Sequence, residues 1–510
     1  MLKYVLTLTL TGLLCSGTIT NTFSQNTSDQ RRIDVTVAGV SKDTIYLANY
    51  YGNKLYYADT TMADAKGHFV FQRKSGYKAG VYAVVVPGPK YFEILVDEPE
   101  IVLHTDTADL LGHLVVKKSQ QNQLFVDYIK HLNVQRKLAE ALKLKIESAS
   151  TMKEKDDLKA QQKAIDPGIR AYQQDMVAKA PGTLLSLIIN MSIVREPLRP
   201  LKADGTLDSS AAYFVNRAHF WDGTDLTDER IVRTPVFHNK FNDYFSKNYI
   251  PQAPDTINKL ADELIAKLGP GEELFKFVVH NVTLTAEKSD IMGMDAVFVH
   301  MARTYYCPKK DGKSRVTWMN DEQLAKMCES ANKKAPLIIG AKSKNLILPD
   351  TAEMNWVNLH QMPEEYIVLV FWESSCGHCK KEIPELHTAW KEKLKALDVG
   401  VYAVCKATDS TMMENWKEFI VEHKLDWVNV GLTWNVYREA KKEPYKFIPQ
   451  YTTLESLNYA DTYDVYATPK LFVLDKERKC VAKSLAPDQL EDLIVRLRKA
   501  DRKPGVKPAQ

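Results

Sequence analysis

The chain has 510 residues, which at roughly 100–200 residues per domain leaves room for about three domains and argues against a single one. Hydrophobic residues make up 45% and charged residues 26%, with 22 Gly and 22 Pro, which excludes collagen-like, mucin-like and wholly disordered chains. The formal net charge of +4 is too small, and the charges are too interspersed, for the basic footprint of a nucleic-acid-binding protein. We therefore expect a multidomain globular protein that does not bind nucleic acid.

The N-terminus has the pattern of a secretion signal. The basic residue Lys3 precedes the apolar run Val5–Leu14, and the small and polar stretch Ser16–Thr22 follows. We predict a signal peptide over residues 1–24, with cleavage near Ser24. The mature protein is then expected in the periplasm or cell envelope.

Two alternatives bear on membrane attachment. Cys15 could become the acylated N-terminus of a lipoprotein, but the bulky Leu14 before it argues against that pattern. The apolar run is too short for a comfortable bilayer span, and no later segment holds about 18 uninterrupted apolar residues. We therefore predict a protein that does not span the membrane.

Residues 30–117 predict an all-β, sandwich-like domain. Short β-rich runs alternate here with Gly, Asp and Pro, as in antiparallel sandwiches. The expected strands are Ile33–Val40, Thr44–Tyr50, Lys54–Thr60, His68–Gln72, Val81–Val86, Tyr91–Val96 and Ile101–His104. The many tyrosines could form a carbohydrate-binding surface, but aromatic residues are also simply good strand residues, and we prefer that interpretation.

Residues 118–334 predict an all-helical domain, because apolar residues now recur at three- and four-residue steps. We read the mostly charged stretch Thr151–Gln162 as a solvated helix face. Further helices are expected at Leu184–Ile193, Arg230–Asn248, Asp255–Leu268, Glu272–Leu284, Ile291–Tyr306 and Glu322–Asn332.

Residues 335–502 alternate strands with helices, which predicts an α/β layered domain, and residues 503–510 form a basic tail. The expected elements are the strand Tyr366–Trp372, a helix after Cys376, the strand Val399–Cys405, a helix from Thr411, the strands Trp427–Val430 and Lys470–Leu474, and a helix from Pro487. The fold class is therefore multidomain: β, then α, then α/β.

Six cysteines follow Cys15, which is too few for a fold held together by disulfides. Cys307 and Cys328 could form a structural disulfide or could equally be unpaired thiols. Cys405 ends a hydrophobic strand and is most simply a core residue. Cys480 stands beside a lysine in a predicted hairpin and could be exposed.

The remaining pair forms a Cys-x-x-Cys motif between a buried strand and a helix. Cys376 is expected at the helix N-terminus, where the dipole and free N–H groups stabilise a thiolate, so it should be the nucleophile. Cys379 lies one turn inside, buried, and close enough to form a redox disulfide with Cys376. His378 between them adds positive charge, and Gly377 completes the motif.

A second element, Thr468-Pro469, stands immediately before a predicted strand. In an α/β domain with a Cys-x-x-Cys helix, this position is that of a cis-proline loop facing the cysteines. There the backbone of Thr468 could pair with an extended substrate and keep metal away from the thiolates.

With these motifs, the segment from about Leu337 to Ala500 resembles the thioredoxin-fold domains of TlpA/ResA-like thiol–disulfide oxidoreductases of the bacterial cell envelope. The resemblance rests on Phe371–Pro384, which contains the two cysteines, and on Thr468-Pro469. It implies that Pro384 kinks the active-site helix. The upstream segments resemble modules of unknown function that accompany such domains.

Two positions depart from the family pattern. Ser375 stands where a tryptophan usually precedes the first cysteine, and Val370 occupies the strand position of the buried acid found in thioredoxin. Because that acid relays a proton to the resolving cysteine, the base is unassigned, and Glu373 is the nearest acidic candidate. The chain between Cys379 and Thr468 is also long, with the excess around Trp434–Tyr463, which could shape substrate choice.

The sequence thus predicts a protein disulfide oxidoreductase of the cell envelope, more specifically a reductase of exported proteins that a membrane thiol reductant recharges. Oxidase or isomerase activity of the same couple is an alternative, which the histidine between the cysteines favours. Another is an adaptor or glycan-binding protein with an accessory thioredoxin domain. Zinc would need a second pair of ligands at matching spacing, and no phosphate-binding glycine loop is present, so no metal or cofactor is predicted.

Overall fold

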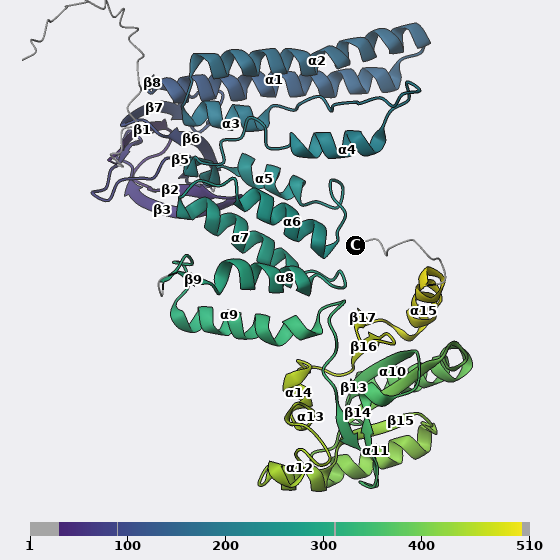
Figure 1. The fold of residues 1–510 in the computed structure, drawn as a ribbon. Helices are drawn as coiled ribbons and strands as arrows, with labels where there is room; N and C mark the ends of the chain where they lie inside the picture. Colours follow the sequence, from purple (N-terminus) through teal and green to yellow (C-terminus); the bar gives the residue numbers. More distant parts are fainter. Residues whose placement is uncertain (1–29, 89, 311–312, 502–510) are drawn as a thin grey trace, which may run out of the picture. The chain divides into compact units, whose positions relative to one another are not determined.

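The computed structural model describes residues 30–88, 90–310 and 313–501 (Figure 1). The predicted signal peptide with Ser24 and Cys15, and the basic tail 503–510, lie outside these residues. The chain divides into two compact units, one ending at Ile193 and the other beginning at Val194. The predicted domain boundaries stay predictions.

The first unit opens with two four-stranded sheets, ordered β4-β1-β7-β8 and β3-β2-β5-β6. The strands are β1 (Arg32–Ala38), β2 (Thr44–Tyr51), β3 (Lys54–Met62), β4 (His68–Phe71), β5 (Gly80–Val86), β6 (Lys90–Val96), β7 (Glu100–Asp106) and β8 (Val115–Lys118). In β1 every second side chain is buried, and these side chains join those of β5 and β6 in one hydrophobic core. The region is therefore a β-sandwich, as predicted, but it is not antiparallel throughout, because β1 pairs with β7 in parallel.

The tyrosines of this sandwich divide between its core and its surface. Tyr77 and Tyr82 are buried, whereas Tyr56, Tyr57 and Tyr91 are exposed. Packing in the core explains the buried tyrosines of this region. It does not explain the exposed ones.

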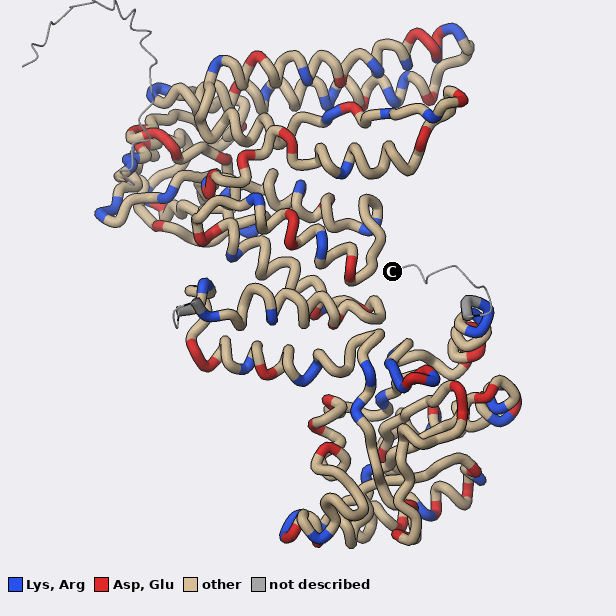
Figure 2. The backbone as a smooth tube through the Cα atoms, in the orientation of Figure 1, with Lys and Arg blue, Asp and Glu red and all other residues tan. Residues whose placement is uncertain are grey.

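Three helices complete the first unit: α1 (Gln120–Ser148), α2 (Met152–Lys179) and α3 (Leu184–Ser192). Each begins after a Ser or Thr whose hydroxyl accepts a backbone N–H of the first turn, a standard N-cap. Helices α1 and α2 run side by side (Figure 1), and both signs of charge are spread along them (Figure 2). That distribution fits the solvated helix face expected for Thr151–Gln162.

The second unit begins with helices α4 (Ser209–Ala218), α5 (Pro235–Tyr244), α6 (Pro254–Ile265), α7 (Glu272–Glu287), α8 (Asp295–Met301) and α9 (Asp321–Lys334). The helix predicted from Arg230 instead begins as a short 3₁₀ turn, and α5 starts at Pro235, where proline suits the first helical position. Within residues 30–501, apart from the short undescribed gaps, no helix is long and apolar enough to cross a membrane.

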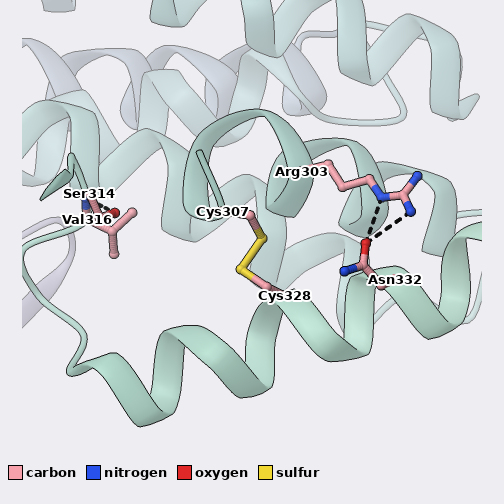
Figure 3. The surroundings of a disulfide bond; sticks show 6 residues. All are labelled: Arg303, Cys307, Ser314, Val316, Cys328 and Asn332. Atoms are coloured by element: carbon pink, nitrogen blue, oxygen red, sulfur yellow. Dashed lines mark hydrogen bonds between the residues drawn. A yellow bond between two sulfur atoms is a disulfide. The ribbon is translucent and has the colours of Figure 1, made fainter. Parts of the chain in front are cut away.

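Cys307 and Cys328, whose state the sequence left open, form a disulfide (Figure 3). Their Cα atoms are 5.7 Å apart. The bond joins the end of the π-helical segment Ala302–Tyr306, which continues α8, to the middle of α9. One turn further along α9, the side-chain oxygen of Asn332 accepts hydrogen bonds from Arg303 at 3.0 and 3.3 Å. Helix α9 is therefore joined at two points to the segment that follows α8.

The C-terminal part of the second unit is built on a five-stranded sheet in the order β15-β14-β13-β16-β17. Its strands are β13 (Tyr366–Trp372), β14 (Val399–Lys406), β15 (Val428–Leu432), β16 (Lys470–Leu474) and β17 (Cys480–Lys483). The first three are parallel, and β16 and β17 are antiparallel to their neighbours. All seven residues of β13 are buried, which explains why this strand reads as a continuous apolar run.

Both faces of this sheet are covered, so the domain has three layers. One face packs against α10 (Gly377–Ala389), α11 (Ser410–His423) and α15 (Pro487–Asp501). The other packs against a small hairpin, β11 (Ile347–Pro349) with β12 (Trp356–Asn358), and against helices α12 (Trp434–Ala440) and α14 (Tyr459–Thr462), with α13 (Leu454–Leu457) between them. The chain that the sequence marked as excess therefore forms one outer layer of the sheet.

The two remaining cysteines are both in this domain's core. Cys405 lies on β14 and is fully buried, in agreement with its predicted role as a core residue. Cys480 lies on β17 and is also buried, because the alternation of the strand turns it and Ala482 into the core.

Candidate active site

The two thiols of the Cys-x-x-Cys motif have different environments. Cys376 caps the N-terminus of α10, directly after β13, and its side chain is partly exposed. Cys379 lies in the first turn of α10 and is fully buried in the core beneath. One thiol can therefore meet a macromolecular substrate, and the other cannot.

The same difference governs their protonation. Burial opposes ionisation of Cys376, but hydrogen bonds from the backbone N–H of Cys379 and from the side chain of Thr468 outweigh it and lower the pKa of the Cys376 thiol. Burial raises the pKa of Cys379 to about 12. At neutral pH, Cys376 is the more readily ionised of the two, as a helix N-terminus favours.

The loop before β16 meets the exposed thiol from the other side. The Cys376 thiol donates a hydrogen bond to the carbonyl oxygen of Thr468 at 3.3 Å, and the Thr468–Pro469 peptide bond is cis. Two segments that are 92 residues apart in the sequence are thus brought into contact, as the sequence predicted from the Thr-Pro position.

The other predicted residues surround this pair. Gly377 and His378 are exposed on the first turn of α10, and Pro384 lies inside the helix, where its missing N–H leaves the carbonyl of Lys380 without its usual helical partner. Ser375 is exposed, and its hydroxyl donates to Glu373 at 2.7 Å.

Glu373 directly follows β13 and precedes Cys376 by three residues. Its carboxylate is mostly covered, and it forms an ion pair of 3.7 Å with Lys406 at the end of the neighbouring strand. Val370, within β13, is buried and apolar, so the strand position that holds a buried acid in thioredoxin holds none here. The sequence analysis did not predict the contact with Lys406. The pairing of Trp372 with Cys405 in the neighbouring strand makes the next two residues neighbours and could have suggested it.

Two further charged residues lie beside the proline loop and were also missed. Lys470 follows Pro469 directly, and its ammonium group contacts the carboxylate of Asp464 at 3.7 Å. A lysine at the start of an otherwise apolar strand was the available signal.

In the described ranges, no group of three or more His, Cys, Asp or Glu residues is arranged to hold a metal ion.

The three-layered fold and the Cys-x-x-Cys motif at the start of α10 define a thioredoxin-like thiol–disulfide oxidoreductase domain. Residues 330–494 match the model of the Redoxin family. The match covers the C-terminal third of the chain, and the sandwich and the helices before α9 lie outside it. No curated protein matches the sequence.

Solved structures similar to the chain include three with related descriptions. A domain of a possible thiol–disulfide isomerase from Cytophaga hutchinsonii is 32% identical over 33% of this chain and 98% of its own, with a TM-score of 0.26. A thioredoxin-like protein from Bacteroides caccae is 14% identical over 59% of this chain and 99% of its own, with a TM-score of 0.40. A DsbE-type thiol:disulfide interchange protein from Chlorobium tepidum is 20% identical over 32% of this chain and 96% of its own, with a TM-score of 0.23.

Proposed function

We propose that this protein reduces disulfides of exported proteins, with Cys376 as the nucleophile and Cys379 as the resolving cysteine. The observation that carries the proposal is the asymmetry of the two thiols. Cys376 is partly exposed with a lowered pKa, and Cys379 is fully buried with a raised one. An attacking thiol must reach the substrate as a thiolate, whereas a resolving thiol need only reach its neighbour.

The reaction runs in two exchanges. The thiolate of Cys376 attacks one sulfur of a substrate disulfide, which forms a mixed disulfide and releases the other substrate sulfur as a thiolate that takes up a proton. The Cys379 thiol then loses its proton and attacks Cys376, which releases the second substrate thiol. The substrate gains two electrons and two protons, and the enzyme is left with a Cys376–Cys379 disulfide.

The neighbouring residues have supporting roles. The Thr468 backbone, beside the nucleophile, offers polar groups to an extended substrate strand, and Pro469 shapes that loop. Glu373 is the proposed proton acceptor for Cys379, since it is the acidic residue next to the motif and is mostly covered. Gly377 borders open space at the N-terminus of α10, and Pro384 removes one helical N–H donor further along.

The location and partners follow from the N-terminal sequence and the chemistry. Export directed by residues 1–24, with cleavage near Ser24, would place the protein in the periplasm or cell envelope, where disulfides form. The spent disulfide must then be reduced by a thiol donor, for which a membrane protein is the natural class. An adaptor with an accessory domain would not need both cysteines and the Thr468-Pro469 loop, which favours the catalytic reading.

The direction of exchange can be tested with one peptide in two redox forms. We expect the fully reduced full-length protein to reduce the disulfide form faster than the oxidised protein oxidises the dithiol form, measured by thiol trapping and mass. The Cys376→Ser variant serves as the control and should do neither. Faster oxidation would assign an oxidase, with His378 as the favouring charge, and no exchange in either direction would reject the proposal.

A further inference from the structure

The loop that faces Cys376 is anchored mainly through its ends. The backbone of residues 466–468 makes no hydrogen bond to another backbone group in the described part of the chain. Yet the Thr468 carbonyl lies 3.3 Å from the Cys376 sulfur. Whatever fixes the two ends of this loop therefore controls the space and polarity at the nucleophile.

Asp464 and Lys470 stand at these two ends and contact each other. The Lys470 ammonium group donates to the backbone carbonyl of Asp464 and lies 3.7 Å from its carboxylate. Burial lowers the pKa of Lys470, which Asp464 opposes, and Lys334 and Lys483 are the other charges that act on it. Asp464 itself has a φ of 54°, in the left-handed region that non-glycine residues rarely adopt.

The Asp464 carboxylate also binds the helical region. Only 15% of its side chain is exposed, and besides Lys470 it pairs with Lys334 at 3.3 Å. Lys334 is the last residue of α9, and the preceding Lys333 pairs with Asp461 at 2.7 Å. Lysines are favourable at a helix C-terminus, so both contacts use charges that the end of α9 accommodates well.

Helix α9 is a firm support for these contacts. Its N-terminus has a capping box, in which Asn320 and Gln323 bond each other's backbone N–H groups. The disulfide to Cys328 and the Arg303–Asn332 bonds fix its middle and its last turn (Figure 3). A chain of contacts therefore runs from the helical region through Lys334, Asp464 and Lys470 to the loop at the active site.

We propose that Lys334 and Asp464 are positioning residues through which helix α9 holds the Thr468 loop against Cys376. The helical region then has a role in the reaction: it sets the reactivity of the nucleophile and the fit of the substrate strand. This inference rests on the proposed function of Cys376.

Lys334→Gln in the full-length protein removes the positive charge with which α9 binds the Asp464 carboxylate. Because a hydrogen bond from the Thr468 side chain, and not its carbonyl, helps to lower the pKa of Cys376, a displaced loop should raise the pH midpoint of Cys376 alkylation, by about half a pH unit. The KM for a peptide disulfide should rise about fivefold, with kcat changed less, since substrate alignment is lost. Asp464→Asn should behave alike.

Two further variants make the test specific. Lys334→Arg keeps the charge and should restore both readouts, and Lys326→Gln removes an exposed pair with Glu322 elsewhere on α9 and should change neither. The inference is overturned if Lys334→Gln matches Lys326→Gln, or if Lys334→Arg fails to rescue. If the wild-type protein exchanges no disulfide at all, it is the proposed function that fails; the alkylation midpoint still reports on the loop.

Discussion

The Cys379→Ala variant should accumulate a covalent complex with its substrate and lose turnover by about a thousandfold or more. Cys376 remains able to attack, but without the buried thiol the mixed disulfide has no internal route to release. The complex should be visible as an adduct of substrate mass that dithiothreitol removes, mapped to Cys376 by peptide analysis.

The matched control for this variant is Cys405→Ala. Both cysteines are fully buried in the same core cluster, so each substitution removes one buried sulfur atom from similar surroundings. Burial holds the pKa of Cys405 well above its usual value, which makes that thiol inert, and the variant should keep normal turnover. Equal losses in the two variants would mean that core packing, and not the resolving step, explains the effect.

Phe371→Ala should destabilise the C-terminal domain by about 3–5 kcal/mol, the usual range for a fully buried aromatic residue. Phe371 is 1% exposed and contacts Tyr459, Tyr463 and Phe472, with ring centroids 5.0–6.2 Å away. Its removal leaves a cavity between the central strand and the outer layer that contains α14. Urea unfolding followed by tryptophan fluorescence measures the change.

An exposed aromatic residue in the same layer gives the comparison. Tyr445 is 85% exposed, so Tyr445→Ala should change the free energy of unfolding by no more than about 0.5 kcal/mol. A loss below about 1 kcal/mol for Phe371→Ala would contradict the packing described for this face of the sheet.

The parts of the molecule that could be predicted from the sequence are those with local signals. The apolar run Tyr366–Trp372 followed by Cys376 fixes a buried strand, a turn and a helix N-terminus within one short segment. The Thr468-Pro469 pair before a strand likewise indicates a loop at the same edge of the sheet. Because both signals come from neighbouring residues, the contact between the thiol and the loop was accessible without a structure.

Distant contacts without such a local signal at either end could not be predicted in this way. Lys334 and Asp464 are 130 residues apart, and two charges in a chain with 68 Lys and Arg carry no sign of their pairing. The spacing of Cys307 and Cys328 also left their state open, because it does not fix the distance between helices. Cys480 was ambiguous because it directly follows the charged Lys479, although strand alternation turns it inward.

In the proposed reaction, Cys376 and Cys379 cycle as a two-electron couple. Equilibration of the full-length protein in glutathione and dithiothreitol buffers, with free thiols trapped and weighed, tests it most directly. We predict that both thiols disappear together, with a reduction potential near or below about −270 mV, as suits a reductase. A potential of about −180 mV, the value of protein disulfide isomerase, would contradict the reductase direction. Two thiols that never form a disulfide with each other would contradict the catalytic role altogether.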